Sequence, residues 1–171
     1  MGSRLAVVAL VTAALGLSGA LPAQAHQPVI LDEQDATPRS GPLLPDGTVS
    51  YAVVADVRAG QERGFRFRLA KGDRLALQYL IVDEAPANAL RPGELPSVQL
   101  IDPSGRMRTL VVNERTEFFE PYSRTTYLFL SRVEERAIPG TYRVIVRGRS
   151  PERVPVTVAV GYREVAGTVI D

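Results

Sequence analysis

The chain has 171 residues, of which 20 are Lys or Arg and 19 are Asp or Glu, so its formal net charge is only +1. A nearly neutral chain has no long-range field to attract nucleic acid or anionic lipid, which argues against both as main partners. Cysteine is absent, which excludes disulfides, a thiol nucleophile and thiolate metal sites.

Residues 1–25 have the order of a secretory signal peptide. Arg4 gives a basic start, residues 5–21 are uncharged and rich in Ala, Val and Leu, and Ala23-Gln24-Ala25 is a small-x-small cleavage site. An uncleaved membrane anchor is the alternative, because 17 apolar or small residues approach the minimum for spanning a bilayer. The cleavage site favours removal after Ala25, which leaves 146 residues in a secreted, periplasmic or cell-envelope protein with no transmembrane segment.

The first half of the mature chain predicts an arm followed by strands. Residues 26–47 are polar and contain four prolines, which indicates an extended N-terminal arm before a domain at 48–171. Residues 48–58 form the first strand candidate. The stretch 63–82 predicts a β-hairpin, since apolar and arginine side chains alternate in its first arm and Lys71-Gly72-Asp73 supplies a turn. Its second arm is apolar on both faces, as in a central strand.

The second half continues the same pattern of short strands and turns. After the long loop at 83–96, a second hairpin is predicted at 97–113, around the type I turn signal Asp102-Pro103-Ser104-Gly105. Three further strands are expected, at residues 125–131, 141–146 and 154–162. About eight strands with no amphipathic helix predict an all-β protein, an antiparallel β-sandwich.

Three motifs follow one another in this order: Phe65-Arg66-Phe67-Arg68-Leu69 with Gly72 behind it, Leu100-Ile101-Asp102-Pro103-Ser104-Gly105, and Gly140-Thr141-Tyr142-Arg143-Val144-Ile145-Val146. Over residues 48–162 the chain resembles the bacterial pre-peptidase C-terminal domain, which has F-x-F-x-L-x-x-G, L-x-D-P-x-G and G-T-Y-x-V-x-V in the same order. The resemblance implies a jelly-roll-like sandwich that serves secreted enzymes as an accessory module.

Counting residue types leaves little room for catalysis. His26 is the one histidine, so a Ser-His-Asp triad would need its base from a chain terminus. A Ser-Lys dyad would need Lys71, which is expected as a solvated turn residue. The sequence therefore predicts a protein that is not an enzyme.

His26 becomes the first residue of the mature chain if cleavage follows Ala25. Its α-amine and imidazole could then chelate Cu(II), and Asp32, Glu33 or Asp35 could complete the site. A copper-binding protein is thus the alternative function, although lytic polysaccharide monooxygenases need a second histidine that this chain lacks. The three acids could also bind Ca²⁺, but they lack a fixed calcium-loop spacing, and a solvated acidic arm explains them more simply.

Phe118, Phe119 and Tyr122 lie together in what the sequence indicates as an aromatic loop. Such side chains can anchor a protein partner or stack on sugars, and the absence of Trp argues against sugars. The usual burial of Phe favours a simpler reading in which Phe118 or Phe119 fills the end of the sandwich. With the loop at 83–96, this loop is the predicted contact surface. The expected function is an exported, non-catalytic binding or accessory protein, without a cofactor, acting on a protein partner or an envelope component.

Overall fold

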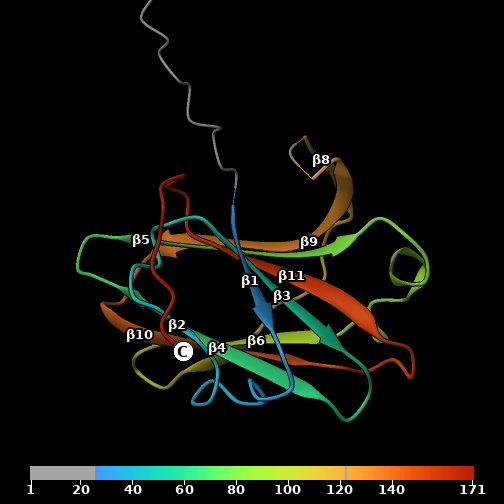
Figure 1. Ribbon diagram of the computed structural model, residues 1–171, viewed down its shortest axis with the longest axis horizontal. Helices are drawn as coiled ribbons and strands as arrows, with labels where there is room; N and C mark the ends of the chain where they lie inside the picture. Colours follow the sequence, from blue (N-terminus) through green and yellow to red (C-terminus); the bar gives the residue numbers. More distant parts are fainter. Residues whose placement is uncertain (1–25, 122) are drawn as a thin grey trace, which may run out of the picture.

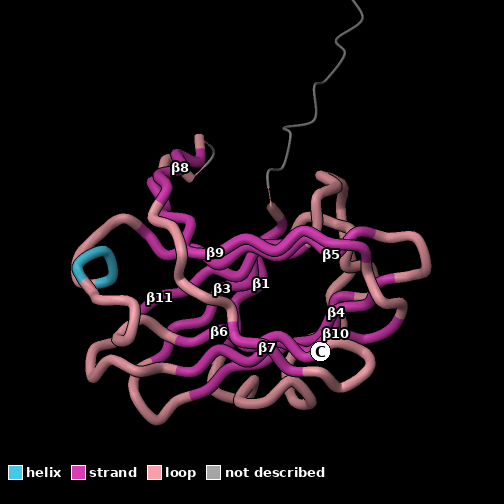
Figure 2. Tube along the Cα trace, turned by 180° about the vertical axis from the view of Figure 1, so that it is seen from behind, coloured by secondary structure: helices cyan, strands magenta, loops and turns pink. Residues whose placement is uncertain are grey.

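The computed structural model describes residues 26–121 and 123–171, which form two β-sheets packed face to face (Figure 1, Figure 2). Residues 1–25, which contain the predicted signal peptide, and Tyr122 lie outside the described residues. Sheet A has six strands in the order β1-β3-β11-β5-β9-β8, and sheet B has five in the order β2-β4-β10-β6-β7. The strands are β1 (Gln27–Leu31), β2 (Leu43–Leu44), β3 (Tyr51–Val57), β4 (Glu62–Leu69), β5 (Arg74–Val82), β6 (Ser97–Ile101), β7 (Met107–Thr109), β8 (Thr116–Glu120), β9 (Thr125–Arg136), β10 (Gly140–Arg147) and β11 (Val154–Val160).

The eight predicted strands correspond to β3, β4, β5, β6, β7, β9, β10 and β11. Counted in chain order from one to eight, they lie in the order 1-8-3-6 in sheet A and 2-7-4-5 in sheet B. This is the strand order of a jelly roll, in which the chain passes repeatedly between the two sheets. The predicted all-β sandwich of jelly-roll type is therefore confirmed.

The predicted hairpin at 63–82 is wrong, because its two arms belong to different sheets. β4 pairs with β10 in sheet B, whereas β5 lies between β11 and β9 in sheet A. The turn at 70–73 is closed by the Asp73 carboxylate, which accepts a hydrogen bond from the Ala70 amide at 2.6 Å, and it leads the chain across the sandwich. Alternation shows which face of a strand is buried but not which sheet the strand joins. The second arm is central, as predicted, and Ala76 and Leu80 are buried on its outer face.

The second predicted hairpin is confirmed as β6 and β7, which pair antiparallel. In its turn the Asp102 carboxylate accepts hydrogen bonds from the Ser104 amide at 2.9 Å and the Arg106 amide at 3.0 Å. Gly105 has φ of 88°, a conformation that glycine adopts without a steric penalty. The hydrogen bond from the Ser104 hydroxyl is the largest of the effects that hold the pKa of Asp102 below its ordinary value.

Residues 26–47, predicted as an extended arm, contribute one strand to an edge of each sheet. β1 pairs in parallel with β3, and β2 pairs in parallel with β4, so both sheets are mixed rather than purely antiparallel. Val29 and Leu31 face the core, while Pro28 and Ile30 alternate with them on the exposed side. Proline is tolerated in β1 because an edge strand can lack one ladder hydrogen bond.

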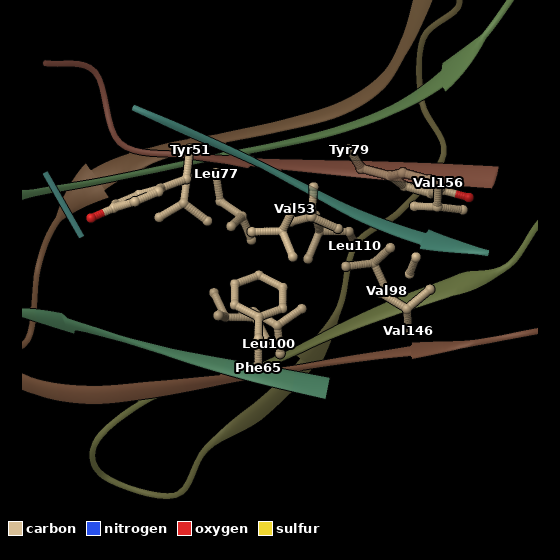
Figure 3. Close-up of a cluster of buried hydrophobic side chains, with 14 of the residues drawn as sticks. Tyr51, Val53, Phe65, Leu77, Tyr79, Val98, Leu100, Leu110, Val146 and Val156 are labelled. Carbon is tan, nitrogen blue, oxygen red and sulfur yellow. The ribbon is translucent and has the colours of Figure 1, made fainter. Parts of the chain in front are cut away.

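The core lies between the inner faces of the two sheets (Figure 3). Side chains of both sheets meet there, including Tyr51, Val53 and Leu77 from sheet A and Phe65 and Leu100 from sheet B. Elsewhere in the core the rings of Phe67 and Tyr142 stack 5.0 Å apart. Burying one such side chain stabilises the fold by about 1.5–3 kcal/mol, so this core can support the sandwich without disulfides.

Candidate functional site

β8 and the first half of β9 form a two-stranded ribbon that stands away from the sandwich (Figure 1, Figure 2). We call residues 116–120 and 125–129 the aromatic ribbon. The predicted loop is therefore wrong, since Thr116–Glu120 is a strand. Four of its five residues are exposed and the fifth is half-buried, so neither face of β8 covers a core. This pattern explains why no alternation marked it as a strand.

Phe118 and Phe119 are adjacent in β8 and therefore point to opposite faces of the ribbon. Phe118 is 37% exposed and Phe119 is 56% exposed. The interpretation that either ring fills the end of the sandwich is wrong, because β8 extends beyond the core. Tyr122, the third predicted contact residue, lies outside the described residues. Phe118 and Phe119 are therefore both accessible to a partner from solvent.

β9 contains a β-bulge at the point where the aromatic ribbon joins the rest of sheet A. Tyr79 pairs with Ser131 and Leu80 pairs with Phe129, so Leu130 is an extra residue in β9. In a regular strand Phe129 and Arg132, three positions apart, would face opposite sides. The extra residue brings them to the same outer face, and bulges also bend the strand that carries them. The bend in β9 is visible in Figure 1.

Phe129 and Arg132 begin a chain of contacts on this outer face. The Phe118 and Phe129 ring centroids are 5.4 Å apart with planes tilted by 41°, a favourable aromatic geometry. The Arg132 guanidinium carbon lies 4.0 Å from the Phe129 ring centroid, a cation–π contact. The same guanidinium forms an ion pair with Glu114 at 2.9 Å. These contacts fix the ring faces and leave Phe118 as the exposed end of the cluster.

An apolar row on the outer face of sheet A leads to this cluster. The register places Ile30 beside Val54, Thr157 beside both Val54 and Leu80, and Leu80 beside Phe129. Ile30, at the far end of the row, is 70% exposed. The outer face of the sheet thus carries mostly apolar side chains from β1 across to the ribbon.

The far edge of β8 is an open sheet edge in the described part of the chain. β8 is the last strand of sheet A, and β9 is its one neighbour there. Half of the backbone N–H and C=O groups of an edge strand point away from the sheet, where they can pair with another extended chain. An edge of this kind, with aromatic side chains on both faces, can bind an extended peptide.

The long loop at 83–96 is tied to the base of the ribbon. The Arg115 guanidinium donates hydrogen bonds to the backbone carbonyls of Asn88, at 2.7 Å, and Leu90. The Asn88 side-chain amide donates to the Asp83 carboxylate at 3.0 Å. The one short helical turn that the sequence allowed is present as the 3₁₀ turn η1 (Ala87–Ala89). The loop and ribbon are therefore neighbours, as the predicted contact surface required.

The candidate copper ligands are not brought together. His26 Nδ1 is hydrogen-bonded at 2.6 Å to the hydroxyl of Ser50, a residue that is almost fully buried. Asp32, Glu33 and Asp35 follow the other end of β1, about 20 Å away at roughly 3.3 Å per residue. The Asp35 carboxylate accepts a hydrogen bond from the Asp32 amide at 2.8 Å, within a local turn. Among the described residues no group of three or more His, Cys, Asp or Glu could hold a metal ion.

A polar pocket of about 550 Å³ lies at another end of the sandwich, and its charges mostly satisfy one another. Asp46 accepts a hydrogen bond from the Thr48 hydroxyl at 2.6 Å and forms an ion pair with Arg163 at 3.3 Å. The Thr48 bond is the main reason that the pKa of Asp46 lies below its ordinary value, and Arg163 adds to the effect. These contacts tie the C-terminal segment to the residues before β3.

Sequence reasoning found Phe118 and Phe119 but missed Phe129, Arg132 and Tyr127, which is the partner of Phe118 across the ribbon. The two missed aromatics could have been recognised, because they alternate with Leu128 and Leu130 and must face away from the core. The role of Arg132 depends on the bulge, for which the sequence carries no clear signal.

Comparison of the chain with protein-family models gave no match, and neither did comparison with curated proteins. In residues 26–121 and 123–171 no helix is long and apolar enough to cross a membrane.

Proposed function

We propose that this is an exported accessory protein that binds an extended segment of a partner protein along β8. The observation that carries the proposal is an open edge strand that stands outside the sandwich and presents Phe118 and Phe119 on its two faces. A partner strand would hydrogen-bond to the β8 backbone, and its alternate side chains would contact one phenylalanine on each face.

Three features support a binding role for this edge. Aromatic side chains contribute strongly to protein interfaces, because each adds a large contact area while few torsions are restricted. The apolar row that ends at Leu80 and Phe129 extends the contact surface beyond the strand itself. The signal-peptide pattern at residues 1–25 and the resemblance to the bacterial pre-peptidase C-terminal domain both fit an accessory role outside the cytoplasm.

Site-specific photocrosslinking in the exporting cell tests the proposal. p-Benzoylphenylalanine is placed at residue 119 or, as a control, at residue 107. Met107 lies on the edge strand of the other sheet and is 54% exposed, which matches Phe119 at 56%. We expect residue 119 to crosslink to a protein that residue 107 does not reach. A polysaccharide or lipid adduct, or the same products at both positions, would exclude a peptide bound at β8.

The crosslinked segment, made as a synthetic peptide, then tests the binding mode. Phe118→Ser with Phe119→Ser should weaken binding by about tenfold or more, as expected for the loss of interface anchors. Methylation of alternate backbone nitrogens in the peptide should abolish binding, because strand addition depends on main-chain hydrogen bonds. If the methylated peptide binds as well as the unmodified one, strand addition is wrong.

A further inference from the structure

A second, smaller pocket lies on sheet B, between the end of the long loop and the chain that follows β7. Its volume is about 320 Å³, at the lower end of the range for ligand sites. Its walls come from the end of the loop, at Pro92, Gly93, Pro96 and Ser97, from the chain between Thr109 and Val112, and from Arg149, which follows β10.

The walls of this pocket are held by hydrogen bonds to the core. The buried Tyr79 hydroxyl donates to the Pro96 carbonyl at 2.7 Å, which fixes the end of the loop against sheet A. On the other wall the Leu110 amide donates to the Val98 carbonyl at 2.8 Å. The side chains of Leu110 and Tyr79 lie in the core below (Figure 3). A pocket with both walls fixed binds a ligand with little ordering cost.

The wall formed by Val111 and Val112 offers both apolar surface and open backbone. Val111 is 69% exposed although it is aliphatic. Within the described residues, the backbone N–H and C=O groups of Val111 and Val112 have no hydrogen-bond partner in the protein. A ligand with its own peptide groups could therefore bond to this wall, whereas a simple hydrocarbon chain could not.

Arg149 supplies an uncompensated positive charge to this mostly apolar pocket. It is exposed and forms no ion pair or hydrogen bond with the described residues. Glu94, the acidic residue between Gly93 and Pro96 in the loop, is already paired with Arg91 at 2.7 Å. Burial raises the pKa of Tyr79, and the charges of Arg149 and Arg115 act in the opposite direction, in keeping with two cations close to this wall. A guanidinium group beside apolar side chains is suited to a carboxylate attached to an apolar group.

We infer that this pocket binds the C-terminal residue of a partner polypeptide. The terminal carboxylate pairs with Arg149, the last side chain is apolar and lies among Pro92, Val111 and Val112, and the preceding peptide group bonds to the backbone of Val111. This site lies on a different sheet from the aromatic ribbon and does not depend on the function proposed for β8.

Titration of the ¹⁵N-labelled protein, residues 26–171, with N-acetyl-Ala-Ala-Ala-Leu tests the inference by NMR. We expect the amide signals of Ser97, Leu110, Val111 and Val112 to shift in a saturable manner. Arg149→Gln should weaken the affinity by about tenfold, the usual effect of losing a charge-assisted hydrogen bond. Arg143→Gln, which removes another exposed arginine whose side chain has no partner among the described residues, is the matched control and should leave the affinity unchanged.

Two further ligands test whether the pocket needs a carboxylate and whether that carboxylate belongs to a polypeptide or to a fatty acid. The amidated form of the same peptide should bind about tenfold more weakly than the free acid, and octanoate should bind more weakly than the peptide because it cannot bond to Val111. Equal binding of the amide would exclude carboxylate recognition, and tighter binding of octanoate would exclude a polypeptide as occupant. If no saturable shifts appear with up to about 10 mM peptide, a concentration above the Kd of weak complexes, the proposal is wrong. The Phe118→Ser and Phe119→Ser double variant should bind this peptide normally, so the two proposals can fail separately.

Discussion

Phe118 and Phe129 hold their rings 5.4 Å apart on the face of the aromatic ribbon that is turned away from the core, and β8 itself buries neither face. The β8–β9 ladder and this ring pair are thus major contributors to the local stability of β8. Phe118→Ala should increase amide hydrogen exchange throughout β8 by about two- to tenfold, since an aromatic pair contributes roughly 0.5–1.5 kcal/mol. The exchange of the core strands should not change.

Phe119→Ala is the control for this experiment. Phe119 lies on the other face of the same strand and makes no ring contact among the described residues. Its removal should leave exchange in β8 nearly unchanged. If both variants accelerated amide exchange in β8 equally, β8 would be stabilised by the size of either side chain and not by the Phe118–Phe129 pair.

The sequence predicts the fold well where each strand has one buried face. In β10, Tyr142, Val144 and Val146 are buried and alternate with Arg143 and Ile145, so the strand and its orientation could be predicted. Alternation carries no information about pairing, which is why β4 and β5 were wrongly joined. The turn at residues 102–105 differs, because its Asp, Pro and Gly favour a tight turn, and a tight turn pairs the two strands that flank it.

The candidate sites were harder to predict for two physical reasons. β8 buries neither face, so the sequence Thr-Glu-Phe-Phe-Glu has no period that distinguishes a strand from a loop. The pocket on sheet B is formed by three segments far apart in the chain, around Pro92, Val111 and Arg149. Each segment is ordinary by itself, and they meet only because the jelly roll places β6 between β10 and β7.

The loop at 37–41 packs directly on β4, and Gly64 makes this possible. A β-carbon at Gly64 would lie 2.4 Å from the Pro38 nitrogen and 2.6 Å from the Thr37 carbonyl carbon. Gly64→Ala should therefore displace the loop and destabilise the protein by about 1–3 kcal/mol, as overpacking does. Urea denaturation measures the change, and amide exchange in β1 and β2 should rise with it.

Gly93→Ala is the matched control, because a β-carbon there would meet nothing within 4 Å. It should be neutral or stabilise the protein by up to about 1 kcal/mol, because alanine lowers the conformational entropy of the unfolded chain. If Gly64→Ala were equally neutral, the N-terminal segment would be an arm independent of the sandwich rather than part of it.

Asp102 should make the stability of the domain sensitive to acid. Its pKa in the folded protein lies below the ordinary value of 3.8, first because of the hydrogen bond from the Ser104 hydroxyl. As the pH falls below about 3.8, the unfolded chain takes up a proton before the folded one does. The stabilisation from this carboxylate is complete above that pH and is lost progressively as the pH approaches the folded pKa.

Asp102→Asn should accordingly lower the urea midpoint at neutral pH, and the difference from the wild type should shrink at about pH 3 or below. Glu152→Gln serves as the control, since the Glu152 carboxylate is exposed and makes no ion pair with the described residues. A difference between wild type and Asp102→Asn that stayed constant with pH would mean that the charge of Asp102 does not stabilise the turn.

Tyr79 connects the stability of the core with the shape of the pocket on sheet B. Tyr79→Phe removes the donor to the Pro96 carbonyl and leaves that oxygen unpaired, which should destabilise the domain by about 1–2 kcal/mol. Because Pro96 is part of the pocket wall, binding of N-acetyl-Ala-Ala-Ala-Leu should weaken as well. Tyr51→Phe provides the comparison: its hydroxyl, also on a fully buried residue, donates to the Thr168 carbonyl at 3.0 Å, away from the pocket. Both variants should lower the urea midpoint, and only Tyr79→Phe should reduce peptide affinity. An equal loss of affinity in both would show that binding follows global stability and not the position of this wall.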